Sequence, residues 1–149
     1  MSEDTTYPKI ETLFARDPNT FKVDVNSVRR PEFFIPQDWL LTEKIDGTNI
    51  RVEQSEDGRL HFFGRTDRAQ IQPNVAAMLE RVFPDSGIVN AAFDSGSHVV
   101  LYGEAYGPKV QKAGGNYRRA EDGPMFRLFD VRVGQWWLNW ADVEDVARK

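Results

Sequence analysis

The sequence has 149 residues, of which 40% are hydrophobic and 12% aromatic, so it can bury one hydrophobic core and is short for two. It contains no cysteine, which excludes disulfide frameworks, thiolate zinc sites and cysteine nucleophiles. The formal net charge of −4 is not that of a general polyanion binder, so any recognition of phosphate must be local.

These bounds predict a single globular domain over residues 1–149. Residues 1–9 are polar and acidic, and no apolar run approaches the roughly 18 residues that a membrane span needs. We therefore expect a cytoplasmic protein without a membrane partner.

The first part of the chain predicts few regular elements. Residues 7–37 mix charged residues and prolines with isolated apolar residues, which we interpret as a short helix followed by extended segments. The apolar run at residues 39–42 fits a buried strand. Residues 50–53 and 60–63 flank the turn sequence Ser55-Glu56-Asp57-Gly58, and this arrangement predicts a β-hairpin.

The clearest helix signal lies at residues 72–83, where apolar residues recur at helical spacing. Asn74 is the expected N-cap and Pro84 the expected terminator. A second helical segment is expected at residues 88–93. The apolar positions of the first helix are Val75, Met78, Leu79 and Val82.

Strands are expected to dominate the second half of the chain. Residues 99–102 and 126–133 are apolar runs typical of strands, and a turn at 134–135 leads into residues 136–138. A last helix is expected in the final segment, with Asn139 or Asp142 as its N-cap.

The most informative segment is Glu43-Lys44-Ile45-Asp46-Gly47-Thr48-Asn49, which precedes the predicted hairpin. An isolated Lys-x-Asp-Gly is most simply a surface turn. The functional interpretation makes Lys44 a nucleophile, because burial or neighbouring cations favour the neutral amine that attacks phosphorus. Gly47 then lets the backbone approach a phosphate, and Asn49 donates to phosphate oxygens.

Further polar blocks follow in chain order. Gly64-Arg65-Thr66 comes directly after the hairpin, Glu104 ends an apolar strand, and Phe129 and Asp130 lie in the strand predicted at 126–133. Taken singly, Glu104 fits an exposed carboxylate and Phe129 an ordinary core ring. Strand alternation puts Phe129 and Asp130 on opposite faces, so both reach one ligand only where the strand ends or twists.

Taken together and in this order, the blocks between residues 43 and 131 resemble the ATP-dependent RNA ligases of the covalent nucleotidyltransferase superfamily. The nucleophile motif of that superfamily has the form Lys-x-Asp/His-Gly, which Lys44-Ile45-Asp46-Gly47 matches. The blocks, with Gln111-Lys112 after them, look most like the bacteriophage-type ligases that reseal nicks in RNA duplexes.

The resemblance implies a role for each matching residue. Lys44 would accept AMP, with Asp46 beside it in the catalytic turn. Arg65 would contact the sugar and phosphate region, and Glu104 would hold the ribose. Phe129 would stack on the purine while Asp130 supports the site. The resemblance adds Glu43 and Asn49 to the nucleotide contacts.

The implied fold is α+β, a nucleotidyltransferase domain whose largely antiparallel sheets frame a nucleotide cleft. ATP and Mg²⁺ are the implied cofactors and RNA, as a nicked duplex or as ends, is the implied partner, although no metal-ligand cluster is legible. The family continues with a Glu-Gly motif and a motif of two lysines, which do not occur before Lys149. The fold is therefore expected to be incomplete at its C-terminus.

Other functions stay open at this point. The missing motifs favour a non-catalytic module that binds a nucleotide or an RNA end. A DNA ligase is a further alternative, because contacts to phosphate carry no base preference. A purely structural domain requires all of the matching blocks to be coincidental.

Overall fold

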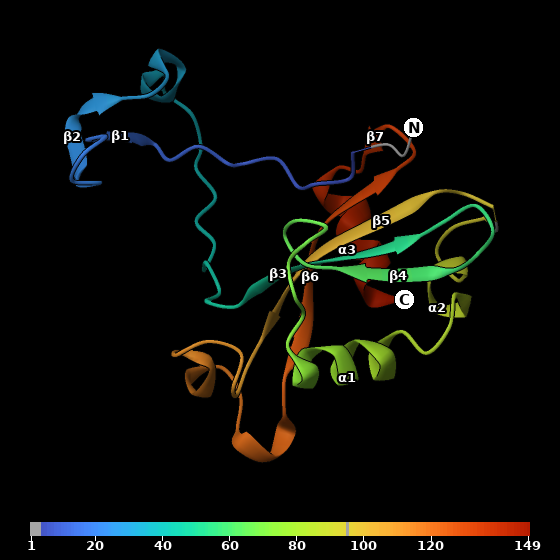
Figure 1. Cartoon of the computed structure of the whole chain (residues 1–149). Coiled ribbons are helices and arrows are strands. Elements are labelled where there is room, and N and C mark those ends of the chain that lie inside the picture. The colour runs from blue at the N-terminus through green and yellow to red at the C-terminus, as the bar shows by residue number, and fades with distance from the viewer. Residues whose placement is uncertain (1–3, 95) are drawn as a thin grey trace. The chain divides into compact units, whose positions relative to one another are not determined.

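The computed structural model describes residues 4–94 and 96–149, which form two compact units. One unit consists of residues 8–43. The other joins the N-terminal residues, described from Asp4 to Tyr7, to residues 44–149 (Figure 1). The single domain expected from the sequence stays a prediction.

The unit of residues 8–43 is built on an antiparallel strand pair, β1 (Phe14–Arg16) and β2 (Val23–Val28), followed by a 3-10 turn at Pro31–Phe34. The prediction that this region begins with a short helix is therefore wrong. The Asp17 carboxylate explains the difference, because it accepts from the backbone N–H groups of Asn19 and Thr20 at 2.9 and 2.7 Å. These bonds stabilise a turn between the strands instead of a helix.

The prediction of a strand at residues 39–42 is also wrong. The structure assigns no regular element there, and the side chains are exposed, with 92% of Leu41 accessible to solvent. A short apolar run fits a strand only if a partner strand lies beside it, and the run itself carries no information about that partner.

The larger unit contains a five-stranded antiparallel sheet in the order β4-β3-β5-β6-β7. The predicted hairpin is confirmed, with its tight turn closed by the bond from Gly58 N–H to the Ser55 carbonyl at 2.8 Å. The expected strands of the second half are confirmed as well. The strands are β3 (Thr48–Gln54), β4 (Leu60–Phe63), β5 (Val99–Tyr106), β6 (Met125–Val133) and β7 (Trp136–Trp137). The fold is α+β with antiparallel sheets.

The helices of this unit are α1 (Pro73–Val82), α2 (Gly87–Asn90) and α3 (Trp140–Arg148). The prediction for α1 is confirmed, but its N-cap is Gln72 because Pro73 occupies the first helical position, which favours proline. Asn139 is the N-cap of α3, where its side chain accepts from Asp142 N–H at 3.1 Å. No helix in residues 4–94 and 96–149 is long and apolar enough to cross a membrane.

Alternation along the strands separates an apolar face from a polar face. Buried residues of the apolar face pack with the helices in one core cluster. That cluster includes Ile50, Val52, Leu101 and Val131 of the sheet, Val75, Met78 and Leu79 of α1, and Val143 of α3. The sheet is therefore held from its apolar side, which leaves the opposite side for polar residues.

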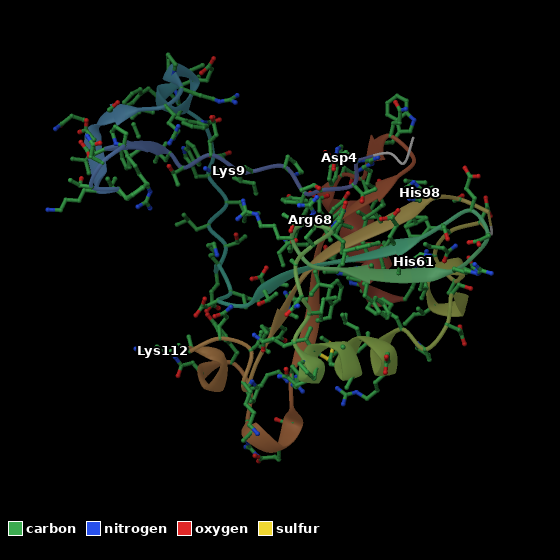
Figure 2. The ribbon with its side chains drawn as sticks, in the orientation of Figure 1. Asp4, Lys9, His61, Arg68, His98 and Lys112 are labelled. Carbon is green, nitrogen blue, oxygen red and sulfur yellow. The ribbon has the colours of Figure 1, made fainter. Side chains whose placement is uncertain are left out.

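The polar face carries Arg51, Tyr102 and Asp130, which lie side by side in the registers of β3, β5 and β6. The N-terminal segment of residues 4–7, which begins near the labelled Asp4 in Figure 2, packs on this face. The Tyr102 hydroxyl donates to the Thr5 carbonyl at 2.9 Å, and the buried Arg51 guanidinium donates to the Thr5 hydroxyl. Two parts of the chain far apart in sequence thus build one surface.

A β-bulge interrupts the pairing of β5 with β6. Tyr102 pairs with Asp130 and Gly103 pairs with Leu128, so Phe129 is the extra residue. The backbones approach closely here: a Cβ on Gly103 would lie 2.2 Å from Phe126 Cζ and 2.6 Å from the Arg127 carbonyl oxygen. Only glycine fits at position 103.

Gly103→Ala is expected to destabilise the protein by about 1–3 kcal/mol, because the added methyl group must displace an aromatic ring and a backbone carbonyl. Urea unfolding measures the change. Gly115→Ala is the matched control, since a Cβ there meets nothing within 4 Å and the change should stay within about 0.5 kcal/mol. Equal stability of the two variants would contradict the bulge geometry.

Candidate functional site

The turn that leads into β3 lies directly against β5. A Cβ on Gly47 would lie 2.2 Å from the Ala105 carbonyl oxygen and 2.8 Å from Glu104 Cγ. The Gly47 N–H also donates a hydrogen bond to the Glu104 carboxylate. Glycine at this position therefore allows the turn that carries Lys44 and Asp46 to approach Glu104, which any larger residue would prevent.

Glu104 is the point at which the charges of the site meet. Burial raises the pKa of its carboxyl group above the ordinary value. The charge of Lys44 and the Gly47 N–H lower this pKa, and the charge of Asp46 raises it. Lys44 itself is exposed, and its positive charge acts on the Glu104 carboxylate. The structure thus brings Lys44, Asp46 and Glu104 together.

Asn49 joins the same group from β3, where it pairs with Glu104 across the strands. Its Oδ1 atom is buried and has no hydrogen-bond partner among residues 4–94 and 96–149. An unsatisfied buried polar atom costs free energy unless a ligand or water supplies the partner. Asn49 therefore offers a polar contact to a ligand lying on this face.

The excursion between β5 and β6, at residues 107–124, docks on the same turn. The Asp46 N–H donates to the Tyr117 hydroxyl at 3.1 Å, and Gln111 Nε2 donates to the Thr48 hydroxyl at 3.3 Å. Lys112, labelled in Figure 2, is exposed on this excursion. Tyr117 was not predicted from the sequence, because nothing in the local pattern indicates a contact with a residue 71 positions away.

Phe129 and Asp130 lie on the polar face of the sheet, two residues along the strands from the Asn49–Glu104 pair. Both contact Tyr7: its ring centroid lies 5.1 Å from that of Phe129, and its hydroxyl donates to Asp130 Oδ2 at 3.0 Å. Alternation alone predicts opposite faces for these neighbours. The bulge supplies the twist that brings both of them to Tyr7.

The electrostatics of Asp130 follow from its surroundings. Burial raises the pKa of its carboxyl group, while the hydrogen bonds from the Tyr7 hydroxyl and the Val131 N–H lower it. Tyr7 was not selected from the sequence, where it stands in an irregular N-terminal segment without a motif.

The contacts described above do not include the remaining predicted site residues, Arg65 and Glu43. Arg65 is exposed after β4, next to Gly64, whose carbonyl accepts from the buried Arg51 Nε at 3.3 Å. Glu43 is exposed and belongs to the unit of residues 8–43. The residues that the structure brings together around Glu104 are therefore Lys44, Asp46 and Asn49, and the roles of all predicted residues stay predictions.

The residues present suit a nucleotide better than a bare metal ion. Within residues 4–94 and 96–149, no group of three or more His, Cys, Asp or Glu side chains is placed to hold a metal. Magnesium commonly binds through one or two carboxylates together with the phosphates of a nucleotide, and needs no such cage. A nucleotide with magnesium on its phosphates fits the groups that lie here: the close backbone of Gly47, the Lys44 cation and the unsatisfied Asn49 oxygen.

A family model described as RNA ligase matches residues 37–149, which include every site residue discussed above except Tyr7. No curated protein matches the chain.

The raised pKa of Glu104 predicts how stability changes with pH. Because its folded-state pKa lies above the ordinary pKa of a glutamate, the folded state binds the proton more tightly than the unfolded state does, and the stability of the fold falls as the carboxyl group ionises with rising pH. Glu104→Gln removes this loss while keeping an acceptor for Gly47 N–H. Urea unfolding should therefore show the variant gaining stability over the wild type between pH 4 and pH 8.

Glu56→Gln, in the exposed hairpin turn, is the matched control for the loss of one carboxylate. If the difference in unfolding free energy between Glu104→Gln and the wild type stayed the same or shrank with rising pH, burial of the ionised Glu104 carboxylate would not destabilise the fold.

Proposed function

Because the chain belongs to the RNA ligase family, we propose that it acts as an ATP-dependent RNA ligase with Lys44 as the residue that accepts AMP. One observation carries the proposal. Lys44, Asp46 and Asn49, predicted from separate features of the motif, meet at Glu104 on one face of the sheet. The proposed fold is the nucleotidyltransferase fold, with this face as one wall of the nucleotide cleft.

The proposed reaction begins when Lys44 Nζ, as the neutral amine, attacks the α-phosphorus of ATP. The new bond is N–P, the bond that breaks joins the α-phosphorus to the bridging oxygen, and pyrophosphate leaves. AMP stays on Lys44 as a phosphoramidate. It then passes to an RNA 5′-phosphate, and the RNA 3′-hydroxyl displaces it to seal the strand.

The proposed binding of ATP divides between the two parts of the polar face. Glu104 would accept from the ribose hydroxyls, and Asn49 would supply a polar contact beside it. Phe129, two residues along the sheet, would stack on the purine. Arg65 and Glu43 are proposed as additional nucleotide contacts on the family resemblance alone.

Mg²⁺ bound to the ATP phosphates would neutralise the negative charge that develops during transfer. The turn at Asp46 and Gly47 would hold the phosphates near Lys44 by its backbone and by the hydrogen bond to Tyr117. RNA is the proposed partner and the cytoplasm the proposed location.

Incubation with ATP and Mg²⁺ is expected to produce an AMP adduct that mass spectrometry assigns to Lys44. Lys44→Ala should abolish the adduct, because no other group replaces the nucleophile. Lys9→Ala removes an exposed lysine of the unit of residues 8–43 and is the matched control, in which the adduct should persist. EDTA should suppress adduct formation.

The absence of any adduct in the wild type, or an adduct that survives in Lys44→Ala, would contradict this chemistry.

A second candidate function is non-catalytic binding of a nucleotide or an RNA end. The exposure of Lys44 favours it, since burial is one of the ways in which proteins obtain a neutral amine. Calorimetry that detects ATP binding without an adduct would select this function. A chain that binds no nucleotide would contradict both candidates.

A further inference from the structure

Tyr7 lies in a cage of aromatic rings on the polar face of the sheet. Its ring centroid is 5.1 Å from those of Tyr102 and Phe129 and 5.7 Å from that of Trp137, with edge-on geometry toward Phe129 and Trp137. Edge-to-face contacts of this kind fix the relative orientation of the rings. The orientation of Phe129 therefore depends on Tyr7.

The hydroxyl of Tyr7 fixes a second group. It donates to Asp130 Oδ2 at 3.0 Å, while the other oxygen, Oδ1, accepts from Val131 N–H at 3.0 Å. Both carboxylate oxygens are thus engaged. Burial and the Asp130 charge raise the pKa of Tyr7 to about 12, so the hydroxyl keeps its proton, and remains a donor, at neutral pH.

Tyr7 is itself held by the segment that carries it. The Thr5 carbonyl accepts from the Tyr102 hydroxyl at 2.9 Å, and the Thr5 hydroxyl donates to Glu53 Oε2 at 3.0 Å. Thr5 is only 5% exposed. These bonds anchor the N-terminal segment on β3 and β5, so Tyr7 is a fixed support and not a mobile tail.

From these contacts we propose that Tyr7 is a positioning residue of the nucleotide site, whose ring and hydroxyl hold Phe129 and Asp130 in the orientation that binds ATP. The bulge brings these two side chains to one side of β6, and Tyr7 is the group that touches both. This inference rests on the proposed function of the same face. Tyr7 acts through its neighbours and takes no part in the chemical step.

The test compares ATP affinity in the wild type, Tyr7→Phe and Tyr7→Ala by calorimetry. Tyr7→Phe removes only the hydroxyl and should weaken ATP binding about tenfold, as expected for a lost hydrogen bond to a charged group. Tyr7→Ala removes the ring as well and should weaken binding further. Ser86→Ala, which removes a half-buried hydroxyl just before α2, is the control and should bind as the wild type does.

A second measurement needs no nucleotide and distinguishes positioning from general loss of structure. Carbon NMR titration of the Asp130 carboxyl should show a higher pKa in Tyr7→Phe, because a hydrogen bond that favours the charged form is gone. The other titratable and charged groups on this face, which include Arg51, Glu53, Tyr102, Glu104 and Arg132, are the same in both proteins. A purely structural role would lower the melting temperature and leave this titration unchanged.

A double-mutant cycle with Asp130→Asn completes the test. Tyr7→Phe should have little further effect on ATP affinity once the carboxylate is absent, because the two groups act as a unit. Additive effects, an unchanged Asp130 titration, or tighter ATP binding by Tyr7→Ala would overturn the proposal. Tighter binding would mean that Tyr7 occupies space which the nucleotide needs.

The outcomes separate this inference from the ligase proposal. A wild-type chain that binds ATP and forms no adduct contradicts the ligase proposal, while the Tyr7 variants still decide the positioning role. A chain that forms the adduct but shows no effect of Tyr7→Phe on affinity or titration contradicts the positioning role alone. A wild-type chain that binds no ATP overturns both.

Discussion

The approach of the Gly47 backbone to β5 sets the geometry on which the candidate site depends. The turn packs so closely that a single added methyl group would lie 2.2 Å from a backbone oxygen. This contact, together with the hydrogen bond from Gly47 N–H to Glu104, keeps Lys44 and Asp46 beside a carboxylate on another strand. Because the closest approach is between backbone atoms, the backbone itself sets the position of the turn, which suits a site that must hold charged groups in place.

The polar face around this contact lowers the stability of the fold, since it holds carboxylates and a guanidinium away from water. Arg51 has no exposed surface, and its charge is balanced by bonds to the Gly64 carbonyl, the Thr5 hydroxyl and the Asp67 carboxylate. Glu104 and Asp130 keep raised pKa values despite their hydrogen bonds. Burial without full compensation is typical of functional sites, where charged groups stay available to a ligand.

The elements that the sequence predicted well carry their own local signal. The apolar spacing of α1 and the turn chemistry of the hairpin each specify an element without reference to the rest of the chain. The strand expected at residues 39–42 failed because its partner is not encoded locally. The bulge at Phe129 was also beyond local pattern, since it follows from the close packing of Gly103 against β6. The motif residues Lys44, Asp46 and Asn49 lie around Glu104, whereas Tyr7 and Tyr117 reach the site through contacts that span most of the chain or half of it.

Tyr7 and Tyr117 are held at the site by the same kinds of contact. The Tyr7 hydroxyl donates one hydrogen bond to Asp130, and the Tyr117 hydroxyl accepts one from the Asp46 N–H. Each of the two tyrosine rings is also held by contacts with other aromatic rings. A ring buried among aromatics loses few degrees of freedom when its hydroxyl binds, so the bond comes at low entropic cost. Segments outside the motifs therefore orient motif residues: the N-terminal segment orients Asp130 through Tyr7, and the excursion between β5 and β6 orients Asp46 through Tyr117.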